Sequence, residues 1–116
     1  VVVAVNPNGI VGASVGDSGA WVLTTSGIDD LTKGQIRKPF LGTNRAVPVG
    51  FSRPALSGTL LVATDGLLKY TSQERIGAAL AGADLDEVAN SLVTLARYPS
   101  GALPDDIGIA LCRTRL

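Results

Sequence analysis

The sequence has no histidine, no methionine and a single cysteine among its 116 residues. Without an imidazole, the serine of Gly-Asp-Ser-Gly at residues 16–19 has no base to activate it, which argues against a Ser-His-Asp triad. The same absence leaves Cys112 without an activating partner, and one cysteine cannot form a disulfide within the chain. We therefore expect Cys112 to be a buried apolar residue, and this cysteine usage favours the reducing cytoplasm.

The chain also lacks a net charge and a long apolar run. Ten basic and ten acidic residues cancel, and no basic cluster is present, so we expect no nucleic-acid partner. No apolar run reaches the roughly 18–20 residues of a membrane span, so we expect no membrane partner. Aromatic residues make up only 4% of the chain, whereas hydrophobic residues make up 46%. The core is therefore predicted to consist of valine, leucine, isoleucine and alanine.

Apolar patterning predicts strands in the first half of the chain, then two helices, then a final strand. Runs rich in valine, leucine and isoleucine, bounded by turn residues, predict strands over residues 1–5, 10–15, 20–25, 59–64 and 107–112. Prolines and glycines interrupt residues 28–58, where we expect short edge strands and an exposed loop, with residues 46–49 the segment that most favours a strand.

The two helices are predicted from their N-terminal capping residues. Thr71 with Glu74, and Asp84 with Glu87, have the spacing of a capping box, and Gly82 ends the first helix. Helices segregated onto one face of a sheet define an α+β fold, with antiparallel β-sheets and a helical pair on the outside. Because the chain opens inside an apparent core strand without a methionine, we interpret it as part of a domain.

Three aspartates stand at the ends of apolar runs. Asp65 follows residues 60–64, Asp105 opens the run that leads into the last strand, and Asp17 follows the second strand. Each aspartate alone is expected to be a turn or cap residue. Together, carboxylates at the tips of neighbouring strands favour a site for a hard cation such as Mg²⁺ or Mn²⁺.

These segments resemble three C-terminal motifs of the metal-dependent type 2C serine/threonine protein phosphatases. The matching segments are Gly-Asp-Ser at residues 16–18, an apolar strand ending in Thr-Asp-Gly-Leu at residues 60–67, and Asp-Asp-Ile-Gly-Ile-Ala at residues 105–110. The resemblance covers nearly the whole chain. It implies that residues 1–116 form the C-terminal portion of a single phosphatase-like domain, part of an α-β-β-α sandwich.

The resemblance also implies an activity and a site. The activity is hydrolysis of phosphoserine and phosphothreonine in proteins by a water that two or three Mg²⁺ or Mn²⁺ ions activate. Asp65 and Asp105 would bind the catalytic pair of ions, and Asp17 would help to hold a third, weaker one. The positions expected to support these ligands are Gly66, Asp106 and Ser18. The implied partners are a phosphorylated protein and the N-terminal half of the same domain.

Two departures from the family leave alternatives open. Gly19 stands where the family has arginine, and the N-terminal motifs for phosphate and for other metal ligands are absent. The chain alone, with no catalytic residue of its own, is therefore expected to be inactive. A non-catalytic phosphatase-like regulatory or protein-binding module is one alternative, and an α+β interaction domain with purely structural aspartates is another. The composition, rich in alanine, glycine and leucine, suits a bacterial protein.

The basic residues of the irregular segment 28–58 have two interpretations. An ordinary solvated loop is the simpler one, and a surface that faces an anionic substrate is the other. The residues concerned are Lys33, Arg37, Lys38, Arg45 and Arg53.

Overall fold

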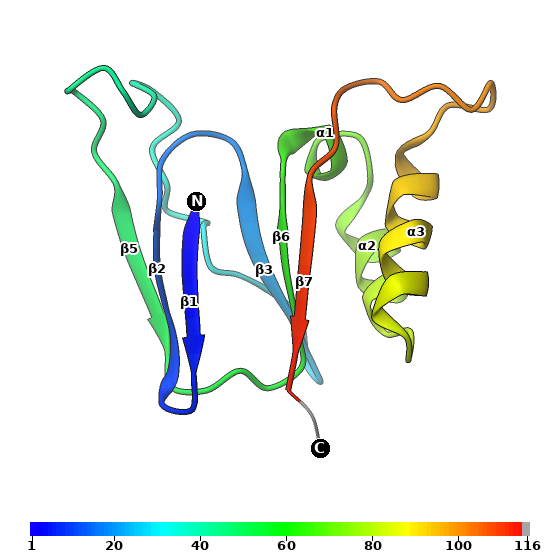
Figure 1. Ribbon diagram of the computed structural model, residues 1–116, viewed down its shortest axis with the longest axis horizontal. Helices are drawn as coiled ribbons and strands as arrows, with labels where there is room; N and C mark the ends of the chain where they lie inside the picture. Colours follow the sequence, from blue (N-terminus) through cyan, green and yellow to red (C-terminus); the bar gives the residue numbers. More distant parts are fainter. Residues whose placement is uncertain (115–116) are drawn as a thin grey trace.

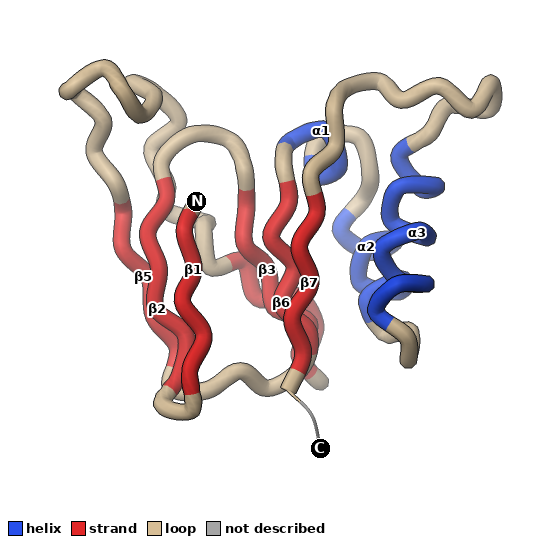
Figure 2. Tube along the Cα trace, in the orientation of Figure 1, coloured by secondary structure: helices blue, strands red, loops and turns tan. Residues whose placement is uncertain are grey.

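Two antiparallel β-sheets face each other, and helices cover the outer face of one of them (Figure 1, Figure 2). The computed structural model describes residues 1–114. The strands are β1 (Val2–Asn6), β2 (Gly9–Ser14), β3 (Gly19–Thr24), β4 (Gly27–Asp30), β5 (Val49–Arg53), β6 (Thr59–Ala63) and β7 (Ile109–Arg113). The helices are α1 (Asp65–Leu68), α2 (Gln73–Leu80) and α3 (Leu85–Ala96). This arrangement confirms the α+β prediction, and the described residues supply the β-β-α layers of a sandwich.

The order of strands is β1-β2-β5 in one sheet and β4-β3-β6-β7 in the other. Strand β6 shows how the alternation of side chains fills two cores. Leu60 packs between the sheets, with Val62 half-buried beside it, whereas Leu61 and Ala63 pack under the helices. Both faces of β6 are apolar because both are covered. Cys112 is half-buried against the core between the sheets, close to its predicted role.

An ion pair joins the two sheets at one side. Arg53, at the end of β5, donates from Nε and Nη2 to the carboxylate of Asp29 on β4, at 2.7 and 3.0 Å. This hydrogen-bonded pair lowers the pKa of Asp29 below its usual range, chiefly through the hydrogen bond from Arg53. This side-chain contact links β4 and β5, which are edge strands of the two different sheets, at one side of the sandwich. Val1 lines a recess with residues of β6 and β7, so β1 and β7 are the strands at the other side.

Side chains cap the first backbone amides of α2 and α3. Asp84 accepts hydrogen bonds from the amides of Asp86 and Glu87, as predicted. The prediction for the preceding helix was wrong by one residue: Ser72 is the cap and accepts from Arg75 N, whereas the Thr71 hydroxyl is buried without a partner within residues 1–114. None of the described helices combines the length and apolar character needed to cross a membrane.

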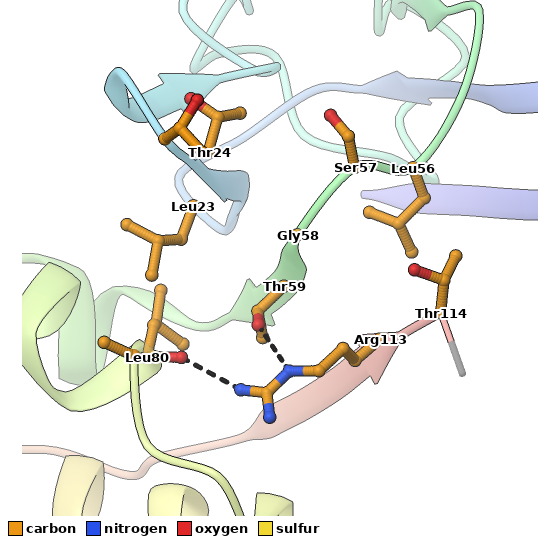
Figure 3. A pocket seen from close by; sticks show the side chains of 11 residues that line it. Leu23, Thr24, Leu56, Ser57, Gly58, Thr59, Leu80, Arg113 and Thr114 are labelled. Carbon is orange, nitrogen blue, oxygen red and sulfur yellow. Dashed lines mark hydrogen bonds between the residues drawn. The ribbon is translucent and has the colours of Figure 1, made fainter. Parts of the chain in front are cut away.

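Arg113 joins the end of β7 to the end of α2 (Figure 3). Its guanidinium donates to the hydroxyl of Thr59 at 2.8 Å and to the carbonyls of Leu80, Gly82 and Ala83 at 2.8–3.0 Å. A cation here satisfies carbonyls that the end of a helix leaves unpaired. Arg113 also lines a cavity of ≈ 660 Å³, which lies at the end of the sheets opposite the segments with Asp65 and Asp105.

Beyond shifts of one residue at the ends of other elements, the structure differs from the sequence-based prediction at β5, β7, β4 and α1. The strand fragment expected at residues 46–49 is β5, which runs from Val49 to Arg53 because its register with β2 pairs Ile10 with Arg53. The last strand begins at Ile109 rather than at residue 107. Strand β4 lies where short edge strands were expected without bounds, and helix α1 was not predicted, because four residues are too few to show a period.

Candidate metal centre

Three strand ends meet at one end of the β4-β3-β6-β7 sheet. Gly19 at the start of β3 pairs with Ala63 at the end of β6, and Ala63 pairs with Ile109 at the start of β7. Continuing this register brings together the turn before β3, the segment after β6 and the segment before β7. Figure 1 shows α1, the start of β7 and the β2–β3 connection at the same upper end. The predicted metal ligands all lie in these three segments.

Thr64 fastens the segment of Asp65 to the segment of Asp105. Its amide donates to the carbonyl of Gly108 at 3.0 Å, and its hydroxyl oxygen accepts from the amide of Gly108 at 2.9 Å. The neighbouring Gly66 is equally constrained, since a Cβ atom there would overlap the carbonyl oxygen of Asp106. The two acidic segments are therefore held in contact. No separate pattern in the sequence indicates this role of Thr64.

Asp65 and Asp105 occupy different surroundings. Asp65 is the first residue of α1 and is half-buried, and neither salt bridge found within residues 1–114 involves it. Asp105 is exposed, and its carboxylate accepts a hydrogen bond from the amide of Asp106 at 2.7 Å. Carboxylates that no arginine or lysine neutralises are the ligands that hard divalent cations prefer. The structure therefore leaves both side chains available to a cation.

Asp17 has a cationic neighbour instead. The guanidinium of Arg37 lies 3.8 Å from its carboxylate, and both side chains are partly exposed. The adjacent Ser18 is held through its carbonyl, which accepts from Gln35 Nε2 at 2.8 Å. An exposed ion pair of this length contributes at most about 1 kcal/mol, so a divalent cation can compete with Arg37. Sequence reasoning missed the pair because no motif links Arg37 to Asp17.

The described residues do not make a complete metal site. Within residues 1–114, no three aspartate, glutamate, histidine or cysteine side chains come close enough together to hold a metal ion. Mg²⁺ demands an octahedron of oxygen ligands, many of which are water. This end of the sheet offers carboxylate, carbonyl and hydroxyl oxygens, which are the type of ligand that Mg²⁺ and Mn²⁺ bind. Further oxygen ligands must come from water or from another segment.

The fold of this chain matches that of bacterial serine/threonine phosphatases of known structure. A bacterial serine phosphatase with a point mutation matches at a TM-score of 0.81 and 26% identity, over 97% of this chain and 52% of that one. The S. agalactiae serine/threonine phosphatase matches at a TM-score of 0.79 and 24% identity, over 94% of this chain and 55% of that one. The catalytic domain of the serine/threonine protein phosphatase PstP, in complex with two manganese ions, matches at a TM-score of 0.74 and 26% identity. This match covers 94% of this chain and 54% of that one.

These structures confirm the resemblance to type 2C phosphatases that the motifs predicted. The chain spans about half the length of the structures it matches. No protein-family model matches the chain, and no curated protein matches it. The likeness therefore rests on the fold, together with a sequence identity near one quarter.

Proposed function

We propose that this chain is the C-terminal portion of a metal-dependent phosphatase domain that hydrolyses phosphoserine and phosphothreonine in proteins. The contact between the segments of Asp65 and Asp105, made by Thr64 and Gly108, is the observation that carries the proposal. It puts two carboxylate-bearing segments side by side at one end of a rigid sheet. The fold shared with serine/threonine phosphatases supports the same conclusion.

The chain's own residues have distinct roles in this proposal. Asp65 and Asp105 hold Mg²⁺ or Mn²⁺, and Asp17 takes part in a weaker third site after it separates from Arg37. Bound ions of this kind lower the pKa of water and neutralise charge on the phosphoryl oxygens. The residues that support the ligands are Gly66, through its close packing on Asp106, and Ser18, through the turn that Gln35 holds.

The remaining ligands come, we propose, from the N-terminal half of the same domain. Strands β1 and β7 each have one partner strand within residues 1–114, and they lie at the same side of the sandwich. An edge with unpaired amides and carbonyls readily accepts another strand. A bacterial origin and a cytoplasmic location belong to the same proposal, supported by the bacterial phosphatases of like fold and by the lone cysteine.

The test uses the chain joined to, or mixed with, the polypeptide that supplies the N-terminal motifs; this assembly is called the reconstituted domain below. Mn²⁺-dependent release of phosphate from a phosphoserine peptide is measured for the wild type and for Asp65→Asn. We expect Asp65→Asn to lose more activity than the roughly 10–100-fold that is typical when a residue hydrogen-bonded to a metal ligand is substituted. Asp86→Asn, an exposed aspartate on α3, is the matched control and should keep full activity. Full activity in Asp65→Asn would refute the proposal.

A phosphatase-like module that binds a partner without catalysis is the second candidate. The ion pair between Asp17 and Arg37 favours it, because that carboxylate already has a cationic neighbour. This candidate predicts a folded reconstituted domain that releases no phosphate with either Mn²⁺ or Mg²⁺.

A further inference from the structure

One exposed segment of this neutral chain has spaced basic residues and no acidic ones. Residues 31–48, here called the basic loop, contain four lysine or arginine residues, and residues 31–64 contain no aspartate or glutamate. All of residues 36–45 are exposed. The contact of Arg37 with Asp17 is the one salt bridge that the basic loop makes within residues 1–114. Lys38 and Arg45 therefore present their charges to solvent.

The basic loop is attached to the turn that carries Asp17. The amide of Gly16 donates to the carbonyl of Ile36 at 2.9 Å, next to the bond from Gln35 to Ser18. Phe40 lies over Gly16, where an added Cβ would be 3.9 Å from its ring. Figure 1 shows the β4–β5 connection reaching the same upper end of the molecule as α1 and the start of β7. The basic loop thus reaches the end of the sheets where the segments of Asp17, Asp65 and Asp105 lie.

Apolar side chains are exposed among these charges. Phe40 and Leu41 are 45% and 69% exposed, and Lys38 Nζ lies 5.7 Å from the centre of the Phe40 ring. The hydroxyl of Thr43 donates to the carbonyl of Phe40 at 2.9 Å, which fixes the tip of the loop. The basic loop also exposes Ile36 and Val47. A surface that combines cations with one aromatic and several aliphatic side chains suits a peptide with acidic and apolar residues. It has too few aromatic side chains for a stacking platform for single-stranded nucleic acid.

We propose that the basic loop binds acidic residues beside the phosphorylated residue of the protein substrate, through Lys38 and Arg45. This inference rests on the proposed function, because a substrate must be present at the aspartate end. The loop then gives the enzyme a preference among phosphoproteins without taking part in the chemistry. The contribution of the loop to binding is electrostatic. It therefore weakens when added salt shortens the screening length below the roughly 8 Å found at physiological ionic strength.

The test compares two fluorescent phosphoserine peptides that differ only in having glutamate or glutamine beside the phosphoserine. Binding to the reconstituted domain is measured by anisotropy without added metal, so that no hydrolysis occurs. Each exposed ion pair changes affinity about two- to threefold, so two pairs should favour the glutamate peptide about fivefold. The double variant Lys38→Gln/Arg45→Gln should reduce this ratio to nearly one, and 0.5 M salt should reduce it in the wild type.

Arg75→Gln on α2 is the matched control for Arg45→Gln. Both arginines are exposed and neither side chain makes a salt bridge within residues 1–114, so Arg75→Gln should keep the fivefold ratio. Equal binding of the two peptides, or a ratio that the double variant leaves unchanged, would overturn the inference. Tighter, loop-dependent binding of single-stranded RNA than of the glutamate peptide would overturn it in favour of nucleic acid.

Mn²⁺-dependent hydrolysis of the same peptides separates this inference from the proposed function. Hydrolysis without loop-dependent binding refutes the role of the loop alone. Loop-dependent binding without hydrolysis refutes the proposed function, and the substrate role of the loop with it. Hydrolysis that favours the glutamate peptide in the wild type, and not in the double variant, supports both.

Discussion

Gly66 is predicted to be intolerant of the smallest side chain. In Gly66→Ala, the new Cβ would lie 2.9 Å from the carbonyl carbon of Asp106 and closer still to its oxygen. Carbon atoms prefer a separation of about 3.5–4.0 Å, so one of the two segments must move by roughly 1 Å. The movement strains the two hydrogen bonds between Thr64 and Gly108, each of which contributes about 1 kcal/mol.

The cost is partly offset, because alanine in a helix is more stable than glycine by up to about 1 kcal/mol. Since overpacking costs about 1–3 kcal/mol, we expect Gly66→Ala to lower the free energy of unfolding by about 1–2 kcal/mol overall. Gly77→Ala in α2 is the matched control. Its Cβ would meet Ile28 at 3.6 Å, an ordinary contact, so this variant should be more stable than the wild type by about 0.5–1 kcal/mol.

Urea denaturation of the reconstituted domain, followed by circular dichroism, measures both variants under the same conditions. The opposite signs of the two substitutions are the informative result, because the residue change is identical and both positions are helical. If Gly66→Ala were as stable as Gly77→Ala, the segments of Asp65 and Asp105 would not be in the close contact described here.

Three further predictions concern the framework of the site. Asp29→Asn should lower the free energy of unfolding at pH 7 by up to about 1 kcal/mol. Because Arg53 lowers the pKa of Asp29 in the folded state, this stabilisation is lost as the pH falls below about 4. The wild type and Asp29→Asn should then have the same free energy of unfolding. A difference that persisted at pH 2 in urea titrations would contradict this. Arg113→Gln should cost about 1.5–3 kcal/mol, because it removes charged hydrogen bonds to three carbonyls after α2; an unchanged melting temperature would show that the carbonyls are satisfied otherwise. Asp84→Ala should cost about 1 kcal/mol through loss of the cap of α3, and an unaltered free energy of unfolding would contradict it.

The central strands of the fold could be predicted because their own residues specify them. The apolar run at residues 59–64 predicted β6, which ends one residue earlier, at Ala63. The cap of α3 at Asp84 was predicted for the same local reason. Strand β5 could not be placed, because its limits come from pairing with β2, some forty residues away in the sequence. Helix α1 is a single short turn whose residues read equally well as the end of a strand.

For the candidate site, the sequence predicted which aspartates stand at strand ends but not what surrounds them. The contact of Gly66 with the carbonyl of Asp106 depends on the register between β6 and β7, which is a long-range property. The pairing of Asp17 with Arg37 depends on the path of the basic loop, which has no regular period. The roles of Asp65, Asp105 and Asp17 as metal ligands stay predictions.

The affinity of the reconstituted domain for Mn²⁺ decides whether this end of the sheet is a metal centre. Titration of free Mn²⁺, followed by electron paramagnetic resonance, would be compared between the wild type and Asp65→Asn, with Asp86→Asn as the control. We expect Asp65→Asn to weaken Mn²⁺ binding by at least about tenfold while the melting temperature stays unchanged. Equal affinity in the wild type and Asp65→Asn would show that Asp65 is a structural residue and would contradict a metal centre at this end of the sheet.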